Sequence, residues 1–287
     1  MEYYIVIPAH NEEAFLEQTL HSILGQSLMP KKIVVVNDHS TDGTEQVIDR
    51  FSAKNTSITK VNATSSTSHM PGSKVINAFN IGLSVLDEDY DFLVKLDADV
   101  VLPEHYFEKI GKIFKTHQQV GIAGGFIFEQ DIDGEWKRNH PMDNDHIRGA
   151  FKAYSKACFR AIGGLRAAIG WDTVDELLAR YHGFELYADP GLKVKHLRPT
   201  GKAYSAKAKL LQGRAMYTMR YGFLMSLIAS LKMMWKQRKP ILLFDNMKGY
   251  FDAKKEKVTF IVSMEEGRFI RKLRWKNIKR KLLKVNS

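Results

Sequence analysis

Short, uninterrupted apolar runs alternate along the first hundred residues with segments in which apolar residues recur every three or four positions. The runs predict strands buried on both faces, and the spaced segments predict helices, because a helix turns once in about 3.6 residues. This alternation is typical of a largely parallel α/β sheet flanked by helices. The predicted strands are 3–7, 32–36, 60–61 and 92–96, and the predicted helices are 15–24, a segment beginning near 42, and 74–86.

The pattern changes after Asp99. Further apolar runs predict strands, the helical spacing returns, and a polar stretch rich in Asp, Asn and His predicts a loop over one face. From about Tyr204 onward the chain is mainly helical and basic. The predicted strands are 120–128 and 191–197, the predicted helices are 150–162 and 172–181, and the polar loop is 129–148.

Polar clusters follow three of the predicted strands, at 8–12, 37–40 and 97–99. In parallel α/β sheets, ligands bind at the carboxyl ends of the strands. Because three separate strands each end in such a cluster, we expect the clusters to meet in one binding site.

Asp97 and Asp99 are the most informative pair in these clusters. Residues i and i+2 of an extended segment point the same way, so both carboxylates project from one face where the strand leaves the sheet. Two hard oxygen ligands side by side suit a divalent metal ion, and the metal ion suits a diphosphate. Taken alone, the pair could equally be two solvated turn acids, and the neighbouring clusters favour the metal interpretation.

Charge indicates the kind of partner. The 287 residues carry a formal net charge of +11, so an anionic partner is expected: nucleic acid, nucleotide phosphates or acidic lipid headgroups. The excess lies partly in the tail, where the segment from Arg268 to Lys284 holds nine Lys or Arg and no acid. The hydrophobic fraction of 44% is that of an ordinary soluble globular protein and is enough for a real core.

The cysteine content and the hydropathy predict the compartment. Cys158 is the single cysteine, which excludes an internal disulfide and fits a reducing environment. No signal-peptide pattern opens the chain, and the longest uncharged apolar stretch near the C-terminus, 221–231, is shorter than the roughly 20 residues of a spanning helix. We therefore expect a soluble or peripheral protein in the cytoplasm.

Three segments, 5–13, 34–44 and 95–99, together resemble the ordered motifs of family 2 glycosyltransferases. These are inverting enzymes with a GT-A fold that use nucleotide-diphosphate sugars. The resemblance covers about the first 200 residues. It implies an α/β fold of the GT-A type, with a mainly parallel central sheet flanked by helices. The implied domains are a catalytic domain, 1–203, with a nucleotide-binding half, 1–100, and an acceptor and catalytic half, 101–203, followed by a basic helical C-terminal extension, 204–287.

The resemblance also implies a donor site on the rim formed by the polar clusters. Asp38 would accept a hydrogen bond from a ring N–H of the base, which suits a pyrimidine, so UDP is the first expectation, with GDP and dTDP open. Asp99 would bind a Mg²⁺ or Mn²⁺ ion that bridges the diphosphate. Asp97 would contact the ribose or the metal ion's water shell, and His196 would be an additional metal ligand. The implied donor-binding residues are Pro8, Ala9, Asn11, Glu12 (with Glu13 as an alternative), Asp38, Lys74, Asp97, Ala98, Asp99, Arg198 and Lys202.

Some of these residues have simple structural interpretations. Asp38 alone could cap a helix, and Lys74 alone is more often a solvated surface lysine. Arg198 and Lys202 lie on a segment containing Pro and Gly, which we expect to fold over the diphosphate as a lid. His10 is a weaker candidate, because it could hydrogen-bond locally and have no role in catalysis.

Glycosyl transfer needs a carboxylate base to take the proton of the acceptor hydroxyl. The resemblance places Asp172 at that position, with Asp175 as the runner-up on nearly the same helix face. Asp175 and Glu176 are better explained as acids favoured by the positive end of a helix. Trp171 stands where many relatives have Glu; it is predicted to stack on the acceptor sugar, and packing in the core is the alternative.

The C-terminal extension mixes basic and aromatic residues, which is typical of a segment lying on an anionic membrane surface. Packing against the catalytic domain is the alternative. The predicted partners are therefore the nucleotide-sugar donor, a glycan or lipid-linked acceptor and an anionic membrane, with no nucleic acid.

Two other function classes remain. A sugar-phosphate nucleotidyltransferase normally has a glycine-rich, arginine-containing loop after its first strand, and residues 8–11 lack both features. A non-catalytic nucleotide- or nucleic-acid-binding protein would not need the complete acidic set.

Overall fold

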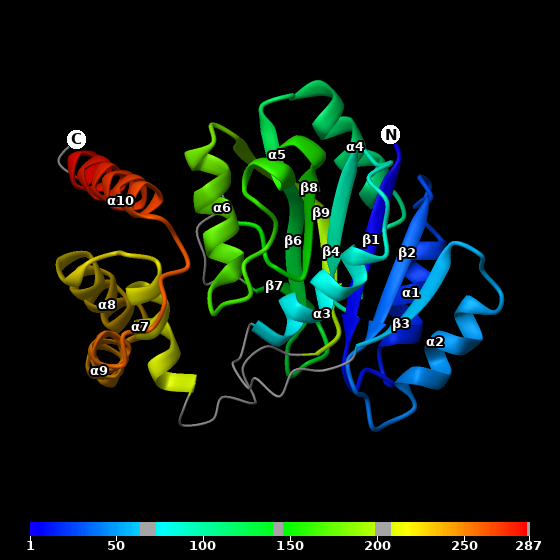
Figure 1. Ribbon diagram of the computed structural model, residues 1–287, viewed down its shortest axis with the longest axis horizontal. Helices are drawn as coiled ribbons and strands as arrows, with labels where there is room; N and C mark the ends of the chain where they lie inside the picture. Colours follow the sequence, from blue (N-terminus) through cyan, green and yellow to red (C-terminus); the bar gives the residue numbers. More distant parts are fainter. Residues whose placement is uncertain (64–72, 140–145, 199–207, 286–287) are drawn as a thin grey trace.

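The computed structural model describes residues 1–63, 73–139, 146–198 and 208–285. In these residues, one mixed sheet has the strand order β3-β2-β1-β4-β8-β6-β9-β5, and β7 pairs with β6 at its side. Helices cover both faces of the sheet, and a separate group of helices stands beside it (Figure 1). The predicted α/β class is therefore confirmed.

The first half of the chain builds the parallel part of the sheet. Strands β1, β2, β3 and β4 run parallel to one another. The predicted alternation of strands and helices is confirmed here, with small shifts at the ends of the elements. The elements are β1 (Tyr3–Ala9), α1 (Leu16–Leu24), β2 (Lys32–Asn37), α2 (Thr44–Ser52), β3 (Ile58–Asn62), α3 (Ser73–Ser84) and β4 (Phe92–Leu96).

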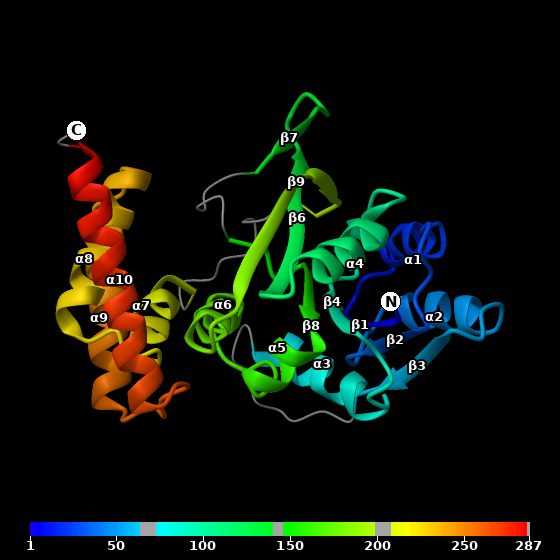
Figure 2. The same cartoon turned by 90° about the horizontal axis from the view of Figure 1, so that it is seen from above.

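Alternating side chains of these strands pack against different helices. The Tyr3 ring on β1 stacks on Phe92 of β4, with 4.7 Å between the ring centroids, and it also contacts Phe107 of the helix α4 (Tyr106–Thr116). On the opposite face α3 lies very close to the sheet, because a Cβ at Gly82 would come within 2.6 Å of Val6. Helices α1, α2 and α4 thus cover one face, and α3, α5 and α6 cover the other (Figure 2).

The second half adds antiparallel strands. Strand β8 pairs antiparallel with β4 and with β6, β5 pairs antiparallel with β9, and only β6 and β9 run parallel among the described strands of this half. The elements are β5 (Val100–Val101), β6 (Val120–Gln130), β7 (Trp136–Arg138), β8 (Phe151–Ser155), α5 (Lys156–Ala161), α6 (Trp171–Tyr181) and β9 (Glu185–His196).

The helix predicted over 150–162 is wrong in its first half. Phe151–Ser155 forms β8, because the edge of β4 offers an unpaired row of backbone groups and this pairing outweighs the local helical spacing. The helix begins only at Lys156, where the Ser155 hydroxyl accepts a hydrogen bond from the Cys158 N–H at 3.3 Å.

The loop predicted over 129–148 is interrupted by a hairpin. Strand β6 continues to Gln130 and pairs with β7. The strand predicted over 191–197 begins earlier, at Glu185. Residues 140–145 of the predicted loop lie outside the described part of the chain.

The C-terminal helices form a group beside α6, namely α7 (Ala208–Thr218), α8 (Phe223–Gln237), α9 (Ile241–Lys255) and α10 (Met264–Val285) (Figures 1 and 2). The group packs against the part of the chain that holds the sheet. Arg166, in the connection between α5 and α6, donates two hydrogen bonds to the Glu266 carboxylate at 2.8 and 3.0 Å. The Tyr181 ring lies edge-on to Phe269, with 5.4 Å between the centroids. The C-terminal extension therefore packs against the rest of the chain, as the alternative to a membrane role predicted.

None of the helices in the described residues is both long enough and apolar enough to cross a membrane. The predicted cytoplasmic location is not tested by this finding. The domain boundary predicted at residue 203 falls in 199–207, outside the described residues, and stays a prediction.

Candidate active site

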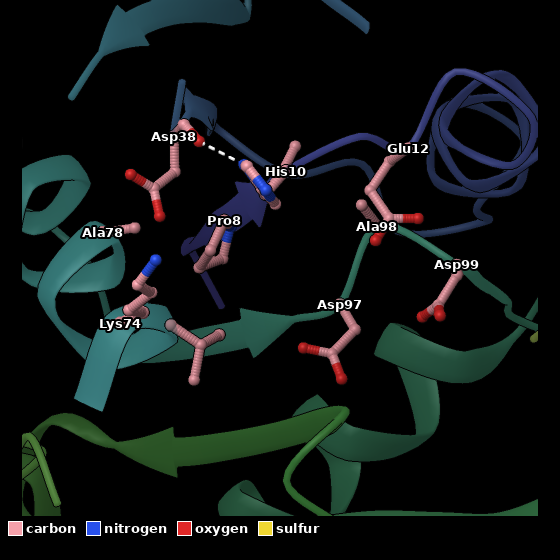
Figure 3. Close-up of a pocket in the computed structure, with 11 residues that line it drawn as sticks. Pro8, His10, Glu12, Asp38, Lys74, Ala78, Asp97, Ala98 and Asp99 are labelled. Atoms are coloured by element: carbon pink, nitrogen blue, oxygen red, sulfur yellow. Dashed lines mark hydrogen bonds between the residues drawn. The ribbon is translucent and has the colours of Figure 1, made fainter. Parts of the chain in front are cut away.

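A cavity of about 280 Å³ opens at the carboxyl ends of β1, β2 and β4 (Figure 3). The three polar clusters that were expected to meet all contribute to its wall. The expectation of a shared hollow is therefore confirmed for these clusters. The lining residues are Pro8, Ala9, His10, Glu12, Asp38, Lys74, Val75, Ala78, Asp97, Ala98 and Asp99.

The loops after β1 and β2 are tied together by backbone and side-chain hydrogen bonds. Asn11 adopts a left-handed backbone conformation with φ of 55°, which Asn tolerates better than most residues. Its side-chain oxygen accepts a hydrogen bond from the Thr41 N–H at 2.8 Å, and its own N–H donates to the Ser40 hydroxyl. The predicted donor-binding residue Asn11 therefore holds the two loops in place and does not line the cavity.

His10 and Glu13 belong to the same framework. The His10 ring lines the cavity while its Nδ1 lies 2.5 Å from the Asp38 carbonyl oxygen. The Glu13 carboxylate accepts a hydrogen bond from the Gly43 N–H at 2.8 Å, just before α2 begins. Glu13, the predicted alternative to Glu12 for donor binding, is therefore occupied by the backbone at the start of that helix.

Asp38 and Lys74 occupy one end of the cavity. They come from the loop after β2 and from the first turn of α3, and Figure 3 shows their charged ends facing each other beside Pro8. The Lys74 side chain is exposed, and the Asp38 side chain is half-buried. A carboxylate acceptor and an ammonium donor at the same end suit a polar heterocycle.

Acidic groups gather at the other end. Glu12, Asp97 and Asp99 lie there, on the side away from Lys74 (Figure 3). Burial, and then the neighbouring charge of Asp99, raise the pKa of Glu12 to about 7, although Arg198 opposes the shift. Like charges brought together in this way favour a bound cation.

His196 and Arg198 bring two basic groups to this acidic end. The His196 Nε2 lies 3.5 Å from Asp99 Oδ2, and its Nδ1 lies 3.1 Å from Glu129 Oε1. Burial alone would lower the pKa of His196, but the carboxylates of Asp99 and Glu129 raise it above its usual value. Arg198 donates to Glu12 at 2.6 Å, and its Nε lies 3.9 Å from Asp99.

The acidic end offers few protein ligands for a Mg²⁺ or Mn²⁺ ion. Among the described residues, no group of three or more His, Cys, Asp or Glu could hold a metal ion by itself. Mg²⁺ in nucleotide-dependent enzymes is usually bound by one or two carboxylates together with substrate phosphates and water. Asp99 with His196 fits an ion of that kind, shared with a diphosphate. Asp97 fits less well, because its carboxylate accepts a hydrogen bond from the buried Lys95 ammonium.

Two buried lysines behind the cavity were not predicted from the sequence. Lys95 on β4 and Lys152 on β8 are directly paired across the strands, and both ammonium groups approach the Trp171 ring, at 5.1 and 5.9 Å from its centroid. Trp171 itself is only 8% exposed. A lysine in the middle of an apolar run was the signal that could have indicated this feature.

Asp172 and Asp175 have different surroundings on α6. The Asp175 side chain is buried, accepts two hydrogen bonds from the Lys152 ammonium at 2.9 and 3.0 Å, and accepts another from the Tyr154 hydroxyl at 2.5 Å. The Asp172 carboxylate remains 33% exposed and faces the His146 imidazole, whose Nε2 lies 3.9 Å from Asp172 Oδ2.

The predicted site residues thus fall into three places. Most donor-binding candidates line the cavity, His196 and Arg198 contact its acidic end, and Trp171, Asp172 and Asp175 lie on α6. Val75, Ala78 and His10 complete the wall and were not among the predicted donor-binding residues. Lys202 lies outside the described residues.

The sequence profile called Glycosyl transferase family 2 matches residues 4–165, more than half of the chain. The chain belongs to glycosyl transferase family 2. The resemblance seen in the sequence motifs is confirmed by this match, and so is the expected enzyme class at the level of the family.

Two curated relatives of this family 2 chain are similar over part of their length. The minor teichoic acid biosynthesis protein GgaA of Bacillus subtilis is 25% identical over an alignment of 151 residues, gaps included, that covers 50% of this chain and 31% of GgaA. The 4,4'-diaponeurosporenoate glycosyltransferase of Staphylococcus aureus is 28% identical over an alignment of 187 residues, gaps included, that covers 57% of this chain and 46% of the relative. The chain thus spans less than half the length of these relatives.

Solved structures share the fold of this family 2 chain. The mannosyltransferase PcManGT from Pyrobaculum calidifontis, in complex with GDP-Man and Mn²⁺, gives a TM-score of 0.59 at 16% identity, with 94% of this chain and 78% of that chain covered. S. aureus TarS 1–349 in complex with UDP-GlcNAc gives a TM-score of 0.57 at 16% identity, with the same shares covered. The expected GT-A fold is therefore confirmed.

Proposed function

We propose that this family 2 chain is an inverting glycosyltransferase that moves a sugar from a nucleotide-diphosphate donor to a hydroxyl of a glycan or lipid-linked acceptor. The observation that supports the proposal is the shared cavity, with Asp38 and Lys74 at one end and Asp99 with its basic neighbours at the other. One end suits a base, and the other suits a diphosphate and a cation.

The donor would lie along the cavity. Asp38 would accept a hydrogen bond from the base, Pro8 would lie beneath the nucleoside, and Lys74 would contact the base or a phosphate oxygen. UDP is the first choice of nucleotide because a pyrimidine ring N–H suits Asp38, and the UDP-GlcNAc complex of TarS is consistent with it. The GDP-Man complex of PcManGT keeps GDP as the second choice.

Asp99 and His196 would hold a Mg²⁺ or Mn²⁺ ion, which when bound would stabilise the negative charge of the leaving diphosphate. The protein itself supplies Arg198 for the same charge. In the structure Arg198 is paired with Glu12, so donor phosphates would compete with that carboxylate for the guanidinium.

Asp172 would act as the general base. Its carboxylate is partly exposed, and the Lys152 ammonium donates to its backbone carbonyl oxygen at 2.5 Å, which fixes the first turn of α6. In the reaction, the acceptor hydroxyl would give its proton to Asp172 as its oxygen bonds to the anomeric carbon. The bond from that carbon to the phosphate oxygen would break, and its electron pair would leave with the diphosphate. Asp175 is a poor candidate, because Lys152 and Tyr154 already occupy its carboxylate.

Trp171 would support the base rather than stack on the acceptor. Its ring packs against Gly149, where a Cβ would come within 2.7 Å of the indole, and faces the two buried ammonium groups. Little of the ring is left for a sugar.

A thermal-shift screen against UDP-, GDP- and dTDP-sugars with Mn²⁺ tests the proposal, since a ligand that binds the native state raises its melting temperature. We expect one of the three nucleotides to raise it, and Asp38→Ala to remove most of that increase. A protein whose melting temperature responds to none of the three, or responds equally in Asp38→Ala, would contradict the proposed donor site. A product assay distinguishes the two enzyme classes. A glycosyltransferase transfers the sugar to an acceptor, whereas a nucleotidyltransferase forms a nucleotide sugar from a sugar phosphate.

A further inference from the structure

Helix α8 buries Met225 but presents several other large apolar side chains outward. Ser226 and Ser230 are fully buried, and each hydroxyl donates to the carbonyl oxygen one turn earlier at 2.8 Å. On the other side, four large apolar side chains are exposed, among them Trp235 at 83%. A helix of a soluble protein normally buries its large apolar residues and exposes its polar ones. The exposed residues are Phe223, Leu224, Leu231 and Trp235.

Helix α9 extends the same surface. It buries Asn246 and Gly249 against α7, where a Cβ at Gly249 would collide with the Leu210 carbonyl oxygen, and it exposes Ile241, Phe244 and Phe251. The ring centroids of Phe223 on α8 and Phe251 on α9 are 5.9 Å apart, so the exposed faces of the two helices are continuous. We call this surface, made of Phe223, Leu224, Leu231, Trp235, Ile241, Phe244 and Phe251, the hairpin face.

The hairpin face is rimmed by positive charge. From Tyr221 to Phe251, the range that carries the hairpin face, the sequence holds five basic residues and one acid, Asp245. Lys232 lies on α8, Arg238 and Lys239 lie in the turn to α9, and all three are exposed. Exposed apolar side chains next to Lys and Arg, with a Trp among them, are typical of helices that lie in the interface of an anionic bilayer.

We propose that the hairpin face docks on a membrane surface that contains anionic lipid, with Trp235 and Phe244 inserted below the headgroups. A second copy of this chain is the less favourable occupant, because a two-fold pairing of this face would bring the same cations against one another. Anionic headgroups complement both the apolar centre and the basic rim. The proposal is independent of the donor and of the reaction.

Flotation of the full chain with vesicles tests the docking. We expect binding to vesicles of phosphatidylcholine with phosphatidylglycerol, weaker binding to phosphatidylcholine alone, and a loss of binding at high salt. The double variant Trp235→Ser, Phe244→Ser should bind roughly tenfold or more weakly, because each side chain loses its apolar burial. The matched control Met29→Ser, Ile132→Ser removes two exposed apolar side chains elsewhere and should bind like the unmodified chain.

Three results would overturn the docking proposal. They are no binding of the unmodified chain, equal binding of the hairpin variant, and a dimer by light scattering that the hairpin variant abolishes. Unchanged circular dichroism and an unchanged melting temperature of the variant show that its fold is intact, so a binding difference then belongs to the face itself.

A second observation concerns His146, beside the proposed base. His146 Nδ1–H donates to Glu176 Oε2 at 3.0 Å, and Glu176 also accepts the Ile147 N–H at 2.9 Å and faces the Lys152 ammonium at 3.1 Å. These partners hold the pKa of Glu176 below its usual value against the effect of burial, so the carboxylate is charged and fixes the imidazole tautomer. The opposite ring nitrogen, Nε2, is buried, has no hydrogen-bond partner among the described groups, and lies 3.9 Å from Asp172 Oδ2.

We infer that His146 is a positioning residue that receives from Asp172 the proton taken from the acceptor. This inference rests on the proposed role of Asp172. The proton would move from the carboxylic acid of Asp172 to the bare Nε2, giving an imidazolium between the carboxylates of Glu176 and Asp172 and returning Asp172 to its charged form. The imidazolium would then lose the proton to water. The present separation is longer than a hydrogen bond, as is common for catalytic groups without substrate.

The variant His146→Gln keeps hydrogen-bonding groups but has no ring nitrogen that takes up a proton. We expect kcat to fall by roughly 10²-fold, KM for the donor to stay unchanged, and the acidic limb of the pH profile of kcat to move. An unchanged pH profile and kcat in His146→Gln, with Asp172→Asn inactive, would overturn the relay alone. Full activity of Asp172→Asn would instead overturn the proposed base.

Discussion

Lys95 and Lys152 lie directly opposite each other on adjacent antiparallel strands, and both are buried. Like charges in this position are destabilising unless other groups compensate. Here the compensation comes from Asp97 on one side, from Asp175 and Glu176 on the other, and from the Trp171 ring that both ammonium groups approach. The pair therefore connects Asp97, at the acidic end of the cavity, with the helix that carries the proposed base.

Removing one of these lysines should destabilise the fold strongly. Lys152→Met leaves the buried Asp175 and Glu176 carboxylates without their cation, and we expect the free energy of unfolding to fall by about 3–5 kcal/mol. Urea denaturation measures the difference. The matched control Lys31→Met removes an exposed ion pair with Asp89 and should change stability far less, because solvent screens that pair. Similar values for the two variants would contradict this description of the buried cluster.

The two aspartates of α6 should respond differently to the same substitution. Asp172→Asn should lower kcat by roughly 10²–10⁴-fold while the donor still binds, because only the base is lost. Asp175→Asn should mainly lower the melting temperature, because its carboxylate compensates Lys152. Steady-state kinetics together with thermal unfolding separate the two effects. A stable Asp175→Asn that has lost turnover, beside an active Asp172→Asn, would show that the base is Asp175.

The Arg166–Glu266 pair should make the docking of the C-terminal helices depend on pH. Burial would raise the pKa of Glu266, but Arg166 and the Ser263 N–H lower it below its usual value near 4.5. A depressed pKa contributes stability above pH 4.5, and this contribution is lost as the pH falls through the folded-state pKa. Glu266→Gln should therefore cost roughly 1–2 kcal/mol at pH 7 and progressively less below pH 4.5.

Denaturation of this variant across pH 3–7 is the measurement. Glu256→Gln, which removes the exposed partner of Arg214, is the matched control and should cost less at every pH. A cost for Glu266→Gln that does not change with pH would show that the side chain acts by packing and not by charge.

The parallel half of the fold was predictable because each of its elements is decided locally. The apolar runs of β1, β2 and β4 are long and uninterrupted, and the cluster after each strand could lie only at the carboxyl edge. The same reasoning predicts Asp38 and Asp99 in one site, and both line the cavity.

The second half depends on contacts that no short window contains. Phe151–Ser155 has the spacing of a helix and becomes a strand because β4 leaves its edge free for pairing. Lys95 and Lys152 become a pair only through that register, and the role of Trp171 follows from the pair. The exposed apolar face of α8 could not be predicted for a similar reason. Its apolar residues surround the helix, and only the burial of Met225, Ser226 and Ser230 shows which face is inside.

Calorimetric titration with UDP, or with the nucleotide selected by the thermal-shift screen, tests the central claim that one cavity binds both the base and the diphosphate with its cation. We predict that Asp38→Ala weakens binding about tenfold or more with or without Mn²⁺, because a hydrogen bond to the base is lost. Asp99→Ala should remove only the increase in affinity that Mn²⁺ produces. Unchanged nucleotide affinity and unchanged Mn²⁺ dependence in both variants would contradict the account.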